Sequence, residues 1–452
     1  MTVLSVLNGL FGLAVLVGIA YVFSADRRAV NWRLVLSGFL LQFLFAILIL
    51  KGDELGALFG PLGWLKQFFA IVSEGFVKVL AFTTEGAKFV FGNLAIGPPA
   101  EGNLGFFFAF QVLPTIIFFA SLMSVLYYLG VMQRIVQGMA WVMARVMGTS
   151  GAESLSNTAN IFVGQTEAPL MIRPFIAGMT RSELLTIMVG GMATIAGGVL
   201  AAYVQMLGYS YAQKHGLPIE AAQAKFAAQL LGASMMAAPA GLALSKILLP
   251  EKDEPQTKGT VKIKIEKNAG NVIEAAAVGA GDGLHLALNV GAMLLAFIAL
   301  IALVNSLLGG LGDVVGINEG LKAAYGSPLS LQLVFGLILQ YLAVALGVPW
   351  SDALNFGSLI GTKLVLNEFV GYLDLARLIA EGKILSEKAV MMATFALCGF
   401  ANFSSIAIQI GGISPLAPER RKDLAALGLK AVLGGTLANL MTATIAGMFF
   451  GS

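Results

Sequence analysis

Three kinds of residue are scarce in this chain, and each shortage excludes a class of function. Only 12% of the 452 residues are charged, about half the roughly 25% that is usual in soluble domains. The single cysteine, Cys398, excludes an internal disulfide and a cysteine metal cluster. The two histidines, His215 and His285, are too few for a histidine-based metal site. No serine–histidine pair or phosphate-binding loop is apparent either, so the sequence argues against a membrane-embedded enzyme.

Apolar residues are correspondingly abundant. They make up 58% of the chain, and the mean hydropathy is +0.84, which places the protein in a lipid bilayer. The net charge of +3 fits basic cytoplasmic loops better than nucleic-acid binding. The first 24 residues have no basic segment ahead of their apolar run, and that run is too long for a signal peptide. We therefore predict that they form the first membrane span.

Eight stretches are long and apolar enough for a simple span, because about twenty apolar residues cross a bilayer. They are Val3–Phe23, Trp32–Leu50, Gly105–Leu129, Leu184–Leu207, Ala221–Leu249, Leu284–Leu308, Lys388–Ile410 and Ala425–Phe450. Basic residues gather after the first, third and fifth of these and before the eighth, which indicates cytoplasmic segments. We predict a multi-pass protein of the cell membrane (plasma or bacterial inner membrane) with both termini outside.

An amphipathic helix is predicted between the third and fourth spans, over Gln133–Met147. Its apolar residues recur at helical spacing along one face, and an arginine lies near each end. These residues are Ile135, Met139, Val142 and Val146, with Arg134 and Arg145. The pattern indicates a helix at the cytoplasmic interface. An ordinary linker helix is the alternative.

Two stretches, Ser154–Phe175 and Ser351–Leu375, carry too many polar residues for a straight span. A re-entrant helical hairpin buried in protein tolerates such residues, since its polar turn lines a cavity. The span count places the base of the first hairpin in the cytoplasm and that of the second outside. This opposite orientation is typical of the inverted repeats of secondary transporters.

Each predicted hairpin contains a carboxylate, Glu167 in the first and Glu368 in the second. A charged side chain at bilayer depth costs roughly 2.5–3.5 kcal/mol even on lenient scales, so we interpret both as functional. A Ser-Glu pair follows each of them, at Ser182 and Ser386, and leads into a span with a small-residue centre. The similar contexts suggest one solute site built from duplicated halves.

The small-residue centres predict a break in each of these two spans, at Gly197-Gly198 and at Gly399. Broken membrane helices expose carbonyl oxygens that coordinate small cations, and sodium accepts neutral oxygens readily. Close helix packing is the alternative explanation for Gly197-Gly198. Beside the second break, amides and aromatic rings suit a flat polar heterocycle, and carboxylates suit vicinal hydroxyls. The residues that together fit a base plus a ribose are Gln165, Thr166, Glu167, Glu368, Asn402 and Ser405; for Asn402 and Ser405, interhelical hydrogen bonding is the alternative.

With these motifs in view, the chain resembles the concentrative nucleoside transporter family. The matching segments are Gly164–Leu170, Leu366–Phe369, Gly399–Ile406, Asn271–Ala277 and Leu286–Met293. The resemblance implies an all-α polytopic membrane protein with eight transmembrane helices, two oppositely oriented re-entrant hairpins, an interfacial helix and an inverted repeat. It also implies a homotrimer with one site per protomer.

The resemblance further implies roles for single residues. Four would contact the nucleobase, namely Gln165, Thr166, Glu167 and Val199. Three would hold the ribose, with Phe400 nearby, namely Glu368, Asn402 and Ser405. The sodium ligands would be Asn160, the Val163 carbonyl, the Thr194 hydroxyl and the Ile195 carbonyl. Relatives commonly have serine at the Thr194 position, and threonine keeps the hydroxyl.

We therefore predict a secondary active transporter, with no cofactor, that imports nucleosides such as uridine by cation symport. Sodium is the expected coupling ion, and an elevator-like hairpin unit is expected to give alternating access. A proton-coupled nucleoside symporter, a symporter for another polar solute and a channel are the alternatives. The predicted parts are residues 1–149 (N-terminal spans and interfacial helix, a scaffold), 150–249 (first hairpin, broken span and following span), 250–350 (cytoplasmic loop, scaffold span and connecting helix) and 351–452 (second hairpin, broken span and C-terminal span).

Overall fold

The computed structural model describes residues 3–58, 60–98, 102–258 and 269–450. Every regular element in these ranges is helical, apart from one isolated bridge between Ser150 and Lys258. The predicted all-helical membrane fold is therefore confirmed at this level. Part of the cytoplasmic loop predicted at the start of residues 250–350 falls on positions 259–268, which lie outside the described ranges.

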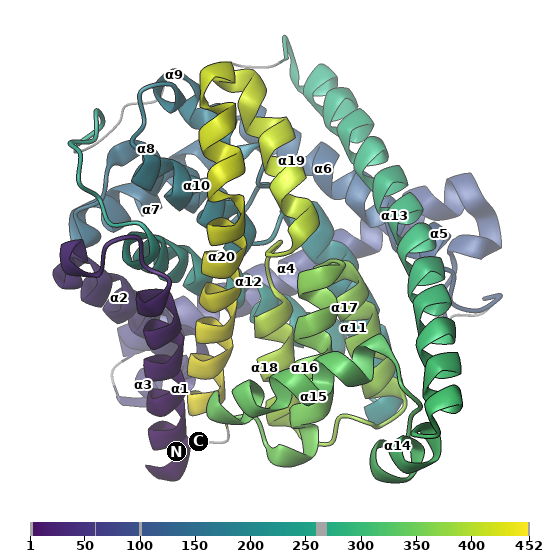
Figure 1. Cartoon of the computed structure of the whole chain (residues 1–452). Coiled ribbons are helices and arrows are strands. Elements are labelled where there is room, and N and C mark those ends of the chain that lie inside the picture. The colour runs from purple at the N-terminus through teal and green to yellow at the C-terminus, as the bar shows by residue number, and fades with distance from the viewer. Residues whose placement is uncertain (1–2, 59, 99–101, 259–268, 451–452) are drawn as a thin grey trace.

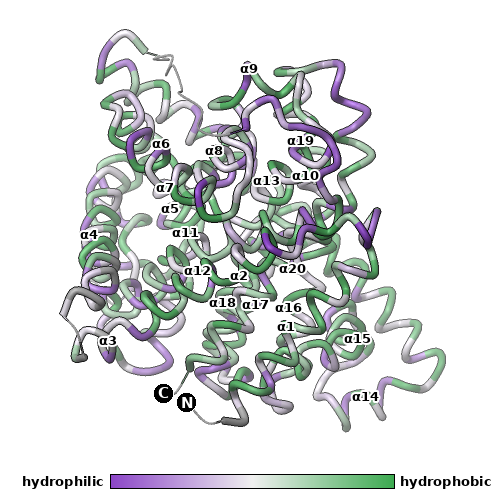
Figure 2. The backbone as a smooth tube through the Cα atoms, turned by 90° about the vertical axis from the view of Figure 1, so that its left-hand side faces the viewer, coloured by the Kyte–Doolittle hydropathy of each residue, from purple (hydrophilic) through white to green (hydrophobic). Residues whose placement is uncertain are grey.

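Eight segments of this part of the chain are long and apolar enough to cross a membrane. They contain α1 (Val3–Val22), α2 (Trp32–Leu50), α4 (Gly60–Phe91), α6 (Leu113–Tyr128), α10 with α11 (Arg181–Ala193, Gly197–His215), α12 (Ile219–Leu248), α13 (Val272–Val315) and α20 (Arg421–Phe449). Seven of them coincide with predicted spans. Figure 2 shows apolar residues along the long helices and hydrophilic ones in connections such as that beside α9.

The predicted span Lys388–Ile410 is broken at the expected place, since α18 (Glu387–Leu397) and α19 (Phe403–Ile413) are separated at residues 398–402. Two other segments were missed. Lys66–Ala95 qualifies by length and composition but was not predicted, since charged residues interrupt its hydropathy. The pair α15 (Leu331–Ala345) and α16 (Trp350–Val365), bent by 119°, was also missed as a unit.

The remaining elements are short or connect the spans. Their bounds are η1 Arg27–Ala29, α3 Gly52–Leu58, η2 Gly92–Ala95, α5 Phe108–Gln111, α7 Val131–Met147, α8 Gly151–Ala159, η3 Ala168–Ile172, α9 Arg173–Ile176, α14 Asn318–Tyr325, α17 Glu368–Ala380, η4 Ser414–Leu416 and η5 Pro418–Arg420.

The interior of the molecule is formed by α10, α11, α12 and α20. In the most apolar stretch of each of these segments 67–83% of the residues are buried, compared with 22% in α1 and in α13. In Figure 1, α20 runs through the middle of the molecule and α13 along one flank, where it packs on α6. The central position of the broken α10–α11 span explains how its polar backbone is kept away from lipid.

The predicted amphipathic helix is present as α7, between the left-handed glycines Gly130 and Gly148. Its buried face carries Met132, Val136 and Met143 and packs on α8. The four residues of the predicted apolar face are exposed or half-buried instead. An apolar stripe left uncovered by protein is compatible with an interfacial helix, and its place at the membrane surface stays a prediction.

Two reversals of the chain lie within the predicted hairpins, at residues 160–167 and at Leu366-Asn367. In the first reversal α8 packs against η3, and in the second α16 packs against α17. Asn367 caps α17, since its side-chain oxygen accepts a hydrogen bond from the Val370 backbone N–H. The two reversals correspond to the turns of the predicted hairpins. At the other end of the fold, α1 packs on α20, so the two ends of the chain lie side by side (Figure 1).

Candidate solute and cation site

Both predicted helix breaks are present. The first follows Ala193, where Thr194 and Ala196 have extended backbones before α11 starts at Gly197. Gly197-Gly198 therefore opens the second half-helix and does not itself form the break. The second break covers residues 398–402, and Asn402 caps α19 by accepting a 2.9 Å hydrogen bond from Ser405 N.

The two breaks touch each other at Gly399. This residue has a φ of +103°, and a Cβ built on it would lie 2.6 Å from the Ala193 carbonyl oxygen and 2.7 Å from the Met192 carbonyl oxygen. Only glycine adopts such a backbone easily and leaves room for this approach. The ends of α10 and α18 are consequently brought together in the middle of the molecule.

Glu368 lies where the second reversal meets both broken spans. Its side chain is buried, with Oε1 accepting a 3.2 Å hydrogen bond from Tyr203 Oη and Oε2 a 2.9 Å bond from Asn402 Nδ2. Tyr203 belongs to α11 and Asn402 to the second break. The position in the first turn of α17 also favours a negative charge, because a helix N-terminus is electropositive.

Gln165 connects the first reversal to the same group of side chains. Its Nε2 donates a 3.2 Å hydrogen bond to Ser405 Oγ, while its Oε1 is buried with no protein partner. Since Asn402 bonds both Ser405 and Glu368, a continuous run of hydrogen-bonded residues joins Gln165 to Glu368. These contacts bring the two reversals together, as one solute site built from both halves requires.

The other predicted nucleobase contacts are placed less directly. Glu167 is exposed, and its Oε2 accepts a 3.2 Å hydrogen bond from Gly164 N in its own turn. No contact between Glu167 and Glu368 is present among the described side chains. Thr166 packs against Gly412 of α19, and Val199 is buried in the first turn of α11. Phe400 is half-buried in the second break.

The four predicted sodium ligands, which lie in the first reversal and in the first break, are all buried. Asn160 donates from Nδ2 to the Ser156 carbonyl, which leaves its buried Oδ1 without a protein partner. Thr194 donates from Oγ1 to the Gly190 carbonyl at 2.8 Å, so its hydroxyl lone pairs are available.

Two hydrogen bonds hold the first turn against this break. Gly197 N donates to the Phe162 carbonyl at 3.2 Å, and Ser234 Oγ on α12 donates to the Ile161 carbonyl at 3.3 Å. The turn that carries Asn160 and Val163 is thereby fixed beside the break that carries Thr194 and Ile195. Neutral oxygens in such an arrangement suit a small hard cation.

Several residues at this site were not singled out from the sequence. Tyr203 gives no sequence signal, since aromatic residues are common in membrane helices. Lys363 and Asn439 bond the carbonyls beside the two breaks. Lys363 could have been found by the argument applied to the carboxylates, because a buried charge in a span is costly.

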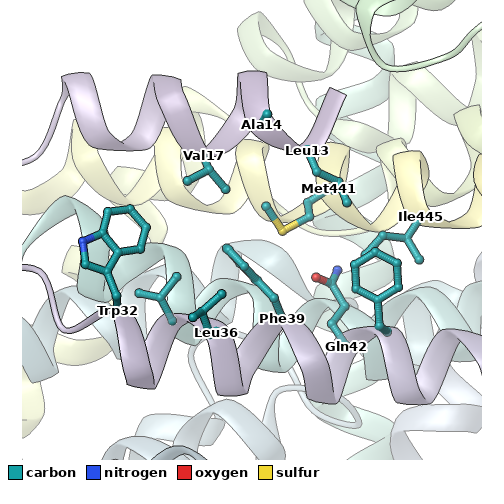
Figure 3. Close-up of a pocket in the computed structure, with 11 residues that line it drawn as sticks. Leu13, Ala14, Val17, Trp32, Leu36, Phe39, Gln42, Met441 and Ile445 are labelled. Carbon is teal, nitrogen blue, oxygen red and sulfur yellow. The ribbon is translucent and has the colours of Figure 1, made fainter. Parts of the chain in front are cut away.

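A separate cavity of about 240 Å³ lies between α1, α2 and α20 (Figure 3). It contains none of the predicted site residues. Its lining is apolar except for Gln42, whose Nε2 donates a 3.0 Å hydrogen bond to Thr442 Oγ1. This cavity lacks the polar groups that a nucleoside requires.

Comparison with known proteins identifies the family. Three family models match consecutive parts of the chain: the Na+ dependent nucleoside transporter N-terminus over residues 11–94, a nucleoside recognition region called Gate over 109–210, and the Na+ dependent nucleoside transporter C-terminus over 229–447. Nucleoside permease NupC of Helicobacter pylori is 44% identical over 99% of both chains. The chain belongs to the concentrative nucleoside transporter family. Members of this family are membrane transporters, not enzymes.

Other relatives extend the comparison. An uncharacterized transporter of Haemophilus influenzae is 47% identical over 99% of both chains. Sodium/nucleoside cotransporter 1 of Rattus norvegicus is 39% identical over 97% of this chain, which spans 63% of that longer protein. The structure of CNTnw in an inward-facing substrate-bound state superposes with a TM-score of 0.84 at 44% identity, over 99% of both chains. Variants of CNTnw in outward-facing and intermediate states match with TM-scores of 0.85.

Proposed function

We propose that this chain imports nucleosides such as uridine by symport with a cation, and that sodium is the coupling ion. One observation carries the proposal most directly. The buried run from Gln165 through Ser405 and Asn402 to Glu368 joins the two reversals between two broken helices. In a nucleoside transporter, a polar cluster at such a place is the natural position for a sugar and a base.

The side chains of this run divide into two groups by chemistry. Glu368 is an acceptor-only group that can take both ribose hydroxyls, and Asn402 and Ser405 beside it can take further donors. Gln165 offers a donor and an unused acceptor, which suits the edge of a base. Thr166, Glu167, Val199 and Phe400 complete the proposed site. On binding, the nucleoside would replace the direct bond between Gln165 and Ser405.

The proposed sodium site consists of Asn160, the Val163 and Ile195 carbonyls and the Thr194 hydroxyl. The unpartnered Asn160 Oδ1 supports it, because a buried acceptor left without a donor is costly unless another group satisfies it. A membrane potential contributes about 2.3 kcal/mol per charge per 100 mV. At about 1.4 kcal/mol per tenfold, one cation can sustain a nucleoside gradient of roughly fifty-fold.

Transport would require the site to face each side of the membrane in turn. We propose that the two reversals, as re-entrant hairpins of opposite orientation, move with the broken helices against a scaffold made of residues 1–149 and 250–350. Similar helix starts support the inverted repeat: Thr180 caps α10 with Glu183 in its first turn, and Ser386 caps α18 with Glu387 in its first turn. A homotrimer with both termini outside completes the proposal.

Uridine uptake into proteoliposomes, with sodium and proton gradients imposed separately, tests this function. We expect a sodium gradient to drive uptake at fixed pH and replacement of external sodium by choline to stop it. Uptake driven only by a proton gradient would favour the proton-coupled alternative. Competition by ribosides but not by free bases would exclude a nucleobase or amino-acid symporter.

A further inference from the structure

Lys363 is a buried cation whose hydrogen-bond acceptors are all neutral oxygens. It lies in the last turn of α16 and is 2% exposed. Its Nζ donates to the Asn439 Oδ1 at 2.7 Å, to the Ala396 carbonyl at 2.9 Å and to the Cys398 carbonyl at 3.4 Å. Three acceptors match the three donors of an ammonium group. Three neutral oxygens around one charge resemble the ligand set of a small cation, but here the cation is the ammonium group of a side chain.

The place of this ammonium in the fold corresponds to that of the proposed coupling cation. In the first half, a residue near the hairpin turn (Asn160) lies beside the break after α10. In the second half, Lys363 comes from the matching helix before the turn and reaches the break after α18. When the halves are aligned on their Ser-Glu pairs, Thr194 stands opposite Cys398, whose carbonyl accepts from Lys363.

Asn439 on α20 extends the contact to the other half. Its Oδ1 accepts from Lys363, and its Nδ2 donates a 2.6 Å hydrogen bond to the Ala193 carbonyl at the end of α10. The last carbonyls of a helix have no partner within the helix and carry partial negative charge. One ammonium and one amide therefore satisfy carbonyls at both breaks, where α10 and α18 point their negative ends at each other.

We propose that the Lys363 ammonium is a tethered cation, which occupies in the second half the place that the coupling cation takes in the first half. Lys363 is then a positioning residue, because its hydrogen bonds fix the carbonyls of the second break without a bound ion. It limits the transporter to one coupling cation per nucleoside. The limit of one coupling cation rests on the proposed symport. Whether the Lys363 ammonium fills a cation site at the second break can be tested without transport.

Sodium binding to the purified protein tests the occupancy, with two variants at the same position. Lys363→Ala removes both the charge and most of the side-chain volume. Radioactive sodium should then occupy one more site per protomer than in the wild type, at the second break. Lys363→Met removes the charge but fills the space with apolar atoms, and no site should be gained. The proposal is overturned if Lys363→Ala binds no more sodium than the wild type, or if Lys363→Met gains a site as well.

A measurement on the wild type keeps the test decisive if Lys363→Ala does not fold. The charge that enters proteoliposomes per uridine should be one, and a ratio of two would overturn the proposal. Absence of any cation-driven uridine uptake would instead contradict the proposed function. The gain of a sodium site is counted on purified protein and remains readable in that case, so the two failures are distinguishable.

Discussion

Asn402 donates a hydrogen bond of 2.9 Å from Nδ2 to Glu368 Oε2, across the point where the second reversal meets the second helix break. The same asparagine caps α19 through its Oδ1. One residue thus ends a break and orients a carboxylate. Because the cap fixes the Asn402 side chain, the carboxylate is held in a defined position before any solute arrives.

Replacing Glu368 by Gln should abolish uridine uptake, with a loss of at least ~100-fold. The amide keeps the shape but loses the charge, and each hydrogen bond to a charged group contributes about 1.5–3 kcal/mol. Uptake into proteoliposomes measures the effect. Glu274→Gln, at the exposed start of α13, is the control and should transport normally. Uptake by folded Glu368→Gln at the native rate would show that the ribose assignment is wrong.

Replacing Gln165 by Leu should raise the uridine concentration for half-maximal uptake about tenfold, because a lost hydrogen bond costs about 1–1.5 kcal/mol. Gln42→Leu is a matched control. Gln42 is also buried, donates from Nε2 and has an unpartnered Oε1, but it lies in the separate cavity. Equal shifts in the two variants would contradict a direct contact between Gln165 and the base.

Removal of the Thr194 hydroxyl should weaken the response to sodium. Thr194→Val keeps the shape and loses the proposed ligand, so the sodium concentration for half-maximal uptake should rise about tenfold or more. Thr194→Ser keeps the hydroxyl and should remain within about threefold of the wild type. Sodium titration of uridine uptake gives both values. Identical sodium dependence in all three proteins would remove Thr194 from the cation site.

Gly399→Ala should destabilise the contact between the two breaks by about 1–3 kcal/mol. The added Cβ would clash with the Ala193 carbonyl, and the φ of +103° is strained for alanine. Gly411→Ala is the control, since nothing lies within 4 Å of a Cβ at that helical position. Thermal unfolding in detergent should show a lower midpoint for Gly399→Ala only.

Lys246→Met should destabilise the fold by about 3–5 kcal/mol, because it leaves a buried charge unpaired. Lys246 Nζ lies 2.8 Å from Glu153 Oε2, with the two side chains 3% and 2% exposed, and it also contacts Glu251. Lys258→Met breaks an exposed pair with Glu254 and should cost less than about 1 kcal/mol. Similar unfolding midpoints for the two variants would contradict the structural role of Lys246.

Hydropathy and polar interruptions predicted most of this fold. Seven spans were found because burial in lipid requires about twenty apolar residues, a requirement visible in any window of the sequence. The missed segment, Lys66–Ala95, has only a marginal hydropathy. α13 extends well beyond the predicted Leu284–Leu308, since its alanine- and glycine-rich first turns are helical without being strongly apolar. Length and polarity alone do not reveal such extensions.

The candidate site was predicted in part. Glu368, Asn402, Ser405 and Gln165 lie together as expected, because polar residues are costly in a membrane interior unless they meet each other. Glu167, in contrast, is exposed and accepts a hydrogen bond from Gly164 in its own turn. Sequence spacing identifies a polar residue but does not determine which way its side chain faces after the chain has turned.

The sequence by itself determined that the chain is helical, lies in a membrane and carries two polar reversals with carboxylates, since each follows from local composition and the cost of charge in lipid. Only the tertiary structure decided that the two helix breaks touch at Gly399 and that Lys363 and Asn439 bond the carbonyls beside both. Those contacts join residues far apart in the chain. Their geometry depends on how α10, α16, α18 and α20 pack, which no local pattern encodes.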